Sequence, residues 1–222
     1  MSSEPSSFKE LMKQRYSCRY FLSKPIPEDI LKDIIATSLL TPSWGNSQPW
    51  NIYVSSGANL ENIRKEWIQK NEEGVKHYSD IDPGHRTDFS ERSQKNMNNI
   101  MTKVSELLND KEIKPFLEAN KILFNAPTVV YITIPKKRTQ YCLFDSGAIE
   151  MSIMLSAKAH GIDSVPAYGA IIYPDILRKH MKIPDDEDIV IGIALGYEDK
   201  DSILNKFKST KLSLDEAAHF YN

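Results

Sequence analysis

The sequence predicts an α+β fold in which a few strands are covered by many helices. Segments with helical spacing outnumber those with strand character, and the two kinds do not alternate as they do in a doubly wound sheet. No internal repeat or low-complexity tract is visible. A chain of 222 residues has the length of one domain with a substantial core, so we expect one compact unit or half of a dimer.

The composition is that of an ordinary soluble protein. Hydrophobic residues make up 41% and charged residues 26%, and 28 basic side chains face 30 acidic ones, for a net charge of -2. This balance argues against disorder and against charge-driven binding to nucleic acid or to a membrane surface. Residues 1–7 are polar, unlike a signal peptide, and the apolar-looking stretch 141–160 contains charged residues, so a membrane span is not expected. Cys18 and Cys142 lack CxxC spacing, which favours a reducing compartment and a cytoplasmic location.

The first quarter of the chain should hold two helices, a shaped loop and a strand. Residues 8–15 carry apolar side chains at helical spacing behind a serine at position 6 or 7 that can cap the helix. A second helix over 27–40 opens with a proline and acidic residues, which are favoured in a first turn. Prolines, a glycine and short polar side chains indicate a loop over 41–50. Residues 51–55 then have strand character.

The middle of the chain is less regular. Residues 59–71 have a helical pattern, but 72–99 become polar and irregular around a proline and a glycine. This stretch is a candidate insertion or lid. Helical segments are expected over 97–108 and 115–124. The nearly continuous β-branched run at 126–134 then predicts a buried strand.

The last third is expected to begin with a long helix over 139–160 that ends at a glycine. Residues 162–172 should be extended, 174–181 helical, and 188–195 a second buried strand. A final helix should start near Ser213, where acidic residues occupy the first turn.

The long helix is apolar or small on nearly every side, so we expect it to be buried all round. Its small residues recur every three or four positions and form a stripe along which another helix can approach closely: Ala148, Ser152, Ser156 and Ala159. A dimer-forming helix is the favoured interpretation, because closed homodimers are the commonest oligomers. A central core helix of a monomer is the alternative.

Two clusters carry candidate chemistry. Arg15, Ser17 and Arg19 share one face of an extended segment, and two guanidiniums beside a hydroxyl suit a phosphate. On spacing alone, two exposed arginines that pair with carboxylates at a helix end are the more frequent arrangement. The loop at 42–50 places two indoles beside short hydrogen-bonding side chains, as in sites that read the polar edge of a flat ring. Its alternative role is to plug the end of the core.

Together these clusters make the chain recognisable. The segments RYSCRYF and TPSWGNSQPWNIYV closely resemble motifs of the flavin-dependent nitroreductase family. Further along, QYCLFDSGAIEMSIMLSAKAHGIDSVPAYGA resembles the family's central helix and the strand that contacts its flavin. DIVIGIALGYED is similar to its terminal strand, and NKFKSTKLSLDE to its closing phosphate element. The motifs occur in the family's order along the whole chain, which makes the resemblance specific.

The resemblance implies a nitroreductase-like, FMN-binding α/β sandwich over residues 1–222. It also implies a homodimer with a long central interface helix and two FMN sites, each built from both subunits. Arg15, Ser17 and Arg19 would hold the FMN phosphate and ribityl chain, and Lys208 and Lys211 would close the phosphate site. The family usually has arginine at the position of Lys211, and a lysine cannot supply the forked geometry of a guanidinium.

The flavin ring would be contacted from two sides. Ser43, Trp44, Asn46 and Gln48 would belong to the loop that meets the cofactor, supplied by the partner subunit. Residues of the VPAYG segment would pass beside the ring: Pro166, Ala167, Tyr168 and Gly169. Backbone amides near Ala167–Gly169 would donate to the N5 and O4 atoms of the ring.

By the same resemblance the chain would be an NAD(P)H-dependent oxidoreductase that reduces a nitroaromatic, a quinone or a similar small conjugated acceptor by a ping-pong mechanism. NADH or NADPH would be the reductant, and no catalytic side chain is required because the chemistry takes place at the flavin N5. A flavin storage or sensing protein and a specialised relative, such as a reductive dehalogenase, are the alternatives. Residues 72–99 would cover the acceptor pocket or form a solvated insertion.

Other kinds of site have little support. The five histidines are scattered without metal-ligand spacing, so no metal site is expected. Cys18 lies between the two arginines, where its thiol could be acidified, but packing into the core is the favoured interpretation.

Overall fold

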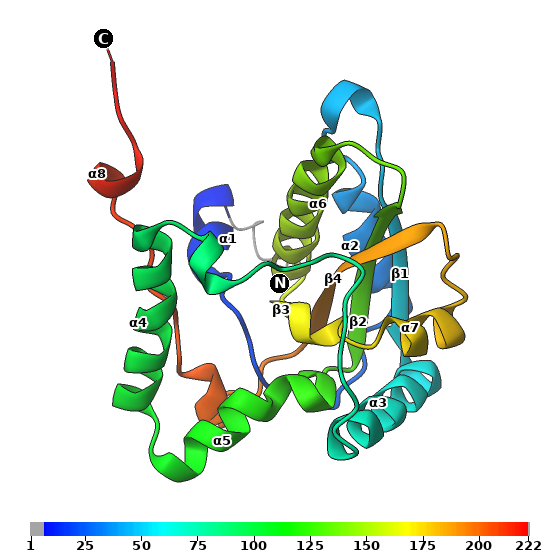
Figure 1. The fold of residues 1–222 in the computed structure, drawn as a ribbon, viewed down its shortest axis with the longest axis horizontal. Coiled ribbons are helices and arrows are strands. Elements are labelled where there is room, and N and C mark those ends of the chain that lie inside the picture. The colour runs from blue at the N-terminus through cyan, green and yellow to red at the C-terminus, as the bar shows by residue number, and fades with distance from the viewer. Residues whose placement is uncertain (1–6, 222) are drawn as a thin grey trace, which may run out of the picture.

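The computed structural model describes residues 7–221 and has a four-stranded antiparallel sheet in the order β1-β2-β4-β3 (Figure 1). The strands are β1 (Asn51–Ser56), β2 (Thr128–Pro135), β3 (Asp163–Ala167) and β4 (Glu187–Gly196). The expected α+β class is therefore confirmed. Ser6, the alternative cap of the first helix, and nearly all of the polar stretch 1–7 lie outside the described residues.

The central strand β2 is buried on both faces, as its uninterrupted apolar run predicts. Val129 and Tyr131 pack on one face against α3 and α7, whereas Val130 and Ile132 pack on the other against α2 and α6. Alternate side chains of one strand therefore join two hydrophobic clusters, and the sheet forms the middle layer between two layers of helices.

The helices follow the order that the sequence predicts. Ser7 caps the first through a reciprocal capping box with Glu10. No helix within residues 7–221 is long and apolar enough to cross a membrane. The helices are α1 (Phe8–Gln14), α2 (Glu28–Ser38), α3 (Gly57–Glu72), α4 (Glu91–Leu107), α5 (Asp110–Glu118), α6 (Gln140–Ala159), α7 (Pro174–Met181) and α8 (Leu214–Ala217).

Three expected boundaries are wrong. Helix α4 begins at Glu91, inside the stretch expected to be irregular, because Ser90 caps it. Helix α5 occupies 110–118 and not 115–124, because Asn109 caps it and the chain turns into left-handed backbone from Leu123 to Asn125. The extended segment expected over 162–172 ends at Ala167, where a short 3-10 helix over Tyr168–Ala170 begins.

The long helix α6 is not buried all round in the single chain. Its inner face packs on the sheet and on α2, and Ser152 of the small-residue stripe lies against Thr41, with 2.6 Å between the hydroxyl oxygens. Part of that stripe is therefore covered by the same chain. The uncovered face carries Leu143, Phe144 and Gly147, and the Phe144 side chain is 74% exposed. An apolar face of this kind lacks a partner within the chain.

The segment between α3 and α4 is anchored to the sheet in its first half. The carboxylate of Asp80 accepts hydrogen bonds from the Arg178 guanidinium of α7 at 2.7 Å and from the backbone N–H of Ile189 of β4 at 2.9 Å. Both charged side chains of this ion pair are largely buried. The backbone N–H of Tyr78 also donates to the carbonyl of Ile172 at 3.1 Å. Residues 78–80 are thus fixed beside α7 and β4.

We predict that Asp80→Ala lowers the free energy of unfolding by about 3 kcal/mol, because removing one partner leaves a mostly buried guanidinium uncompensated. Asp82→Ala is the matched control, since the exposed Asp82 carboxylate accepts only from the N–H of Gly84. Urea denaturation followed by circular dichroism measures both variants. Equal stability of the two would contradict the anchoring role of Asp80.

Candidate functional site

A cavity of about 290 Å³ lies beside the edge strand β3, between the segment that follows α1 and the segment that precedes α8. It brings together all five residues predicted for the phosphate site. They line it with five neighbours: Met12, Lys13, Arg15, Tyr16, Ser17, Arg19, Phe207, Lys208, Ser209 and Lys211. Residues separated by about 190 positions in the chain are therefore neighbours in space.

The first wall of this cavity is held by pairing with the sheet. The chain leaves α1 in extended conformation at Arg15, and Ser17 then pairs in parallel with Ser164 of β3. The backbone N–H of Cys18 donates to the carbonyl of Ser164 at 3.0 Å. The segment carrying Arg15, Ser17 and Arg19 is thus an added edge of the sheet, in line with the face-sharing expected from its extended period.

Asn205 joins the two walls. This buried amide accepts from the backbone N–H groups of Arg19 and Tyr20 at 2.7 and 3.1 Å, and it donates to the carbonyls of Tyr20 and Asp199. It therefore fixes where Phe207 and the residues after it meet the first wall. Sequence reasoning missed this residue, because an asparagine that bonds a distant backbone has no local pattern.

The cavity holds positive charge that no carboxylate neutralises. The Arg19 guanidinium lies against the edge-to-face pair of Phe116 and Phe207, 5.0 and 4.9 Å from their ring centroids, and it donates to the carbonyl of Ser17 at 2.9 Å. Burial lowers the pKa of Arg19 below its ordinary value. The Nε of Arg15 is buried without a hydrogen-bond partner among the described residues.

None of the cavity's two arginines and three lysines, Lys13, Lys208 and Lys211, forms an ion pair within residues 7–221. The Lys208 ammonium lies 4.6 Å from the centroid of the Tyr16 ring, and that of Lys211 donates to the hydroxyl of Ser209 at 3.2 Å. The half-buried carboxyl group of Glu150 interacts with Arg15 without forming an ion pair, and burial raises the pKa of Glu150 more than Arg15 lowers it. The arrangement is suited to a small dianion.

The strand beside the cavity leads to the predicted ring-contacting residues. Pro166 and Ala167 end β3, and Tyr168 and Gly169 begin the short 3-10 helix. A Cβ atom at Gly169 would lie 2.5 Å from the side-chain nitrogen of Asn120, so this position requires glycine. The Oδ1 of Asn120 is buried without a partner in the described chain. Asn120 is a second candidate that sequence reasoning missed, since it lies in a segment without any motif.

The loop predicted to meet the cofactor is elsewhere on the surface. None of Ser43, Trp44, Asn46 and Gln48 lines the cavity, and the Trp44 side chain is 62% exposed. The loop is nonetheless ordered by its own hydrogen bonds, since the Ser43 hydroxyl accepts from the N–H of Gln48 at 2.9 Å. Within one chain, these four residues are not brought together with the other nine.

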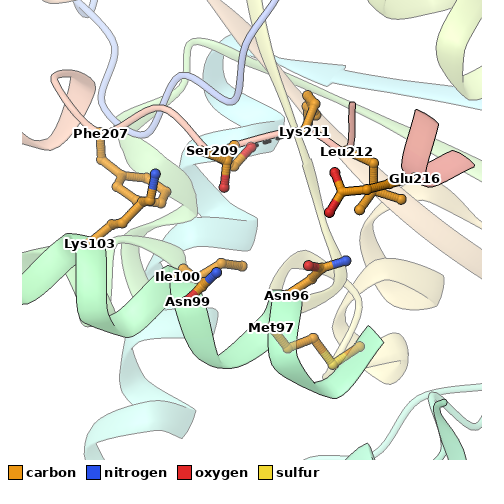
Figure 2. A pocket seen from close by; sticks show the side chains of 11 residues that line it. Asn96, Met97, Asn99, Ile100, Lys103, Phe207, Ser209, Lys211, Leu212 and Glu216 are labelled. Carbon is orange, nitrogen blue, oxygen red and sulfur yellow. Dashed lines mark hydrogen bonds between the residues drawn. The ribbon is translucent and has the colours of Figure 1, made fainter. Parts of the chain in front are cut away.

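A second cavity, of about 470 Å³, lies on the far side of the segment carrying Ser209 and Lys211 (Figure 2). Figure 2 shows Asn96, Ile100 and Lys103 of α4 facing that segment across the cavity. The residues from Phe207 to Lys211 therefore form a wall shared by two cavities. In residues 7–221 no group of three or more metal-ligating side chains is gathered at a single point.

The fold and the first cavity together define an α+β protein with a cationic ligand site at the edge of its sheet. The sequence profile of the nitroreductase family matches residues 12–197, and the chain belongs to that family.

Its relatives include a chloronitrobenzene nitroreductase from Comamonas testosteroni, 26% identical over 95% of each chain. An iodotyrosine dehalogenase 1 homolog from Caenorhabditis elegans is 25% identical over 90% of this chain and 58% of the relative. Among solved structures, the FMN-dependent nitroreductase NfnB from Mycobacterium smegmatis, in complex with NADPH, superimposes with a TM-score of 0.88. It covers 96% of this chain and 97% of its own, at 22% identity, and so shares the fold.

The thiol of Cys18, which lies between the two arginines in the sequence, is unreactive because it is buried. Cys18 is fully buried, its Sγ lies 3.4 Å from the carbonyl oxygen of Tyr20, and burial raises its pKa to about 12. The expected inward packing of Cys18 is confirmed.

We predict that iodoacetamide at about pH 8 alkylates the partly exposed Cys142 and not Cys18, which stays protonated far above neutral pH. Peptide mass spectrometry measures both sites, and denatured protein, in which both react, is the control.

Proposed function

We propose that the chain is an FMN-dependent oxidoreductase that uses NADH or NADPH to reduce a nitroaromatic, a quinone or a similar small conjugated acceptor. The observation that carries this proposal is the uncompensated positive charge of the cavity beside β3, which matches the phosphate monoester of FMN in charge and size. Family membership and the printed names of the relatives point to the same cofactor and the same class of acceptor.

The residues present fit FMN. Arg15, Ser17 and Arg19 would hold the phosphate and the ribityl chain, and the unpartnered Nε of Arg15 is a donor that a phosphate oxygen would satisfy. Lys208 and Lys211 would close the phosphate site from the opposite wall.

The ring would lie along Pro166–Gly169. At the start of the 3-10 helix the first backbone N–H groups have no partner within the helix, and so remain free to donate. The unpartnered Oδ1 of Asn120, packed beside Gly169, is an acceptor of the kind that the imide N–H of a flavin requires.

When bound, FMN supplies the redox chemistry, accepting a hydride from the dinucleotide and passing electrons to the acceptor. The chain's own residues then bind and orient. Backbone donors near Ala167 and Gly169 would stabilise added negative charge at the ring, and the positive charge of the cavity would hold the phosphate. A single open ring face would require donor and acceptor to bind in turn, which is the basis of the ping-pong expectation.

We further propose that the site is completed in a homodimer. The loop at 43–48 and the apolar face of α6 with Leu143 and Phe144 are both exposed in one chain, and the loop is seated on that same helix. Pairing through α6 would cover the apolar face and carry each loop toward the cavity of the other copy. Ser43, Trp44, Asn46 and Gln48 would then act in trans.

Residues 72–99 would form part of the acceptor pocket. The hydroxyl groups of Ser79 and Tyr168 lie 3.0 Å apart, so the anchored half of this segment touches the predicted ring-contacting turn. The half from Gly84 onward carries exposed side chains, among them Arg86, which would attract a carboxylated aromatic acceptor.

Two alternatives are separated by turnover. The chain is 26% identical to the chloronitrobenzene nitroreductase and 25% identical to the dehalogenase homolog, so a test of acceptors is what separates nitroreduction from reductive dehalogenation. A storage or sensing flavoprotein would bind FMN but be reduced by NADH and NADPH only slowly. Anaerobic stopped flow, followed by a screen of acceptors against the reduced protein, distinguishes these functions.

We predict that Arg19→Met weakens FMN binding by about tenfold to a hundredfold, the range expected for loss of a hydrogen bond to a charged group. Methionine can occupy the place of the Arg19 side chain against the rings of Phe116 and Phe207, so the fold is retained. Arg86→Met, at an exposed arginine whose side chain bonds Asn98, is the control. Fluorescence titration with FMN measures both, and unchanged affinity in Arg19→Met would remove Arg19 from the site.

We also predict that Gly147→Glu converts a dimer into monomers and reduces FMN retention. No atom lies within 4 Å of a Cβ at Gly147, so the substitution is harmless to a single chain and raises its helix propensity. At an interface the added carboxylate would be buried without a partner. Asn62→Glu, on the exposed side of α3, is the matched control. Light scattering after size exclusion reports the mass, and a dimer that survives Gly147→Glu would exclude this face.

A further inference from the structure

The loop at 43–48 holds an unfavourable backbone conformation. Asn46 and Gln48 have φ values of 57° and 43°, in the left-handed region that residues other than glycine rarely adopt, and Gly45 lies there too. A backbone of this kind persists only where its surroundings determine it. The loop's own bond between Ser43 and Gln48 closes the turn but does not attach it to the rest of the molecule.

The attachment comes from a buried carboxylate of α6. Both oxygens of Asp145 lie within hydrogen-bond distance of the backbone N–H of Trp44, at 3.2 and 3.1 Å, and the residue is only 2% exposed. Asp145 forms no ion pair within residues 7–221. Burying a charge lowers the stability of a fold, so an apolar side chain at this position would stabilise the core at least as well.

Two further contacts lie on the same side of α6. The rings of Tyr141 and Trp44 are 5.6 Å apart, and the hydroxyl of Ser152 meets that of Thr41 just before the loop. Tyr141, Asp145 and Ser152 are four and seven residues apart, which places them along one face of a helix. The loop is therefore seated along α6, with Asp145 as the one charged contact.

We propose that Asp145 is a positioning residue, which acts through the Trp44 amide to hold Asn46 and Gln48 in the conformation that meets the cofactor. The inference rests on the proposed function, since it presumes that the loop contacts FMN. A charge-assisted bond to the first turn of the loop fixes the backbone from which the following side chains project. Asp145 itself touches neither cofactor nor acceptor.

Three variants of the full-length chain separate positioning from mere stability. Asp145→Leu keeps the branched shape of the side chain, with methyl groups in place of the oxygens, but cannot accept a hydrogen bond, whereas Asp145→Asn retains one acceptor oxygen. Ser146→Ala is the matched control, because the equally buried Ser146 hydroxyl donates only to the carbonyl of Cys142 within the same helix.

The first readout is hydrogen exchange at the Trp44 amide, measured without cofactor. Asp145→Leu should remove the protection of this amide, and Asp145→Asn and Ser146→Ala should retain it. The second readout is the affinity for FMN, which should fall about tenfold in Asp145→Leu and be largely restored in Asp145→Asn. The melting temperature of Asp145→Leu should be unchanged or higher, since an apolar residue replaces a buried charge.

Unchanged Trp44 exchange in Asp145→Leu, or lost protection with unchanged FMN affinity, would overturn the proposal. A parallel fall of melting temperature and affinity would also overturn it, since that result indicates a structural role. If the unaltered chain does not take up FMN at all, the proposed function itself fails and this inference fails with it. Loss of Trp44 protection in Asp145→Leu would then still show the anchor, so the two failures are distinguishable.

Discussion

A guanidinium held against a pair of phenyl rings, without an ion-pair partner among the described residues, is the constraint on which the site depends. Arg19 is stabilised as a partly buried cation by cation–π contacts and one carbonyl. This arrangement requires a rigid backbone, and Asn205, on the second wall, supplies that rigidity by bonding the backbone of Arg19 and Tyr20 on the first. That requirement fixes the positions of three elements: the sheet edge at β3, the end of α1 and the segment after Asn205.

Local patterns made the sheet and most helices predictable, because β-branched runs and caps act within a few residues. The clustering of Arg15, Ser17 and Arg19 was visible for the same reason. Asn120, Asn205 and Asp145 were not, since each acts on backbone or glycine far away in sequence. The early starts of α4 and α5 were missed because polar caps, and not apolar spacing, set them. The burial of α6 was misjudged because composition does not tell which face a chain covers by itself.

The two parts of the predicted site, the cationic cavity and the loop at 43–48, are held by different elements of the chain. The cationic cavity is built beside the edge strand by segments far apart in the sequence, whereas the loop at 43–48 is carried by α6, which also packs against α1 and β3. Each part is well ordered alone, and neither surrounds a ligand the size of FMN. In the proposed homodimer, association of two chains would be a condition for activity, because the second copy would supply the loop that each cavity lacks.

The position of Lys208 and Lys211, almost at the end of the described chain, has a consequence for biosynthesis. The ribosome synthesises the residues of the first cavity wall long before those of the second. The sheet can pair fully once β4 has emerged. The nascent domain therefore begins to pair its sheet before the second cavity wall, with Lys208 and Lys211, has been synthesised. If FMN is the ligand, as proposed, the complete phosphate site would form only after that wall has emerged, so the sheet would fold first and the cofactor would bind afterwards.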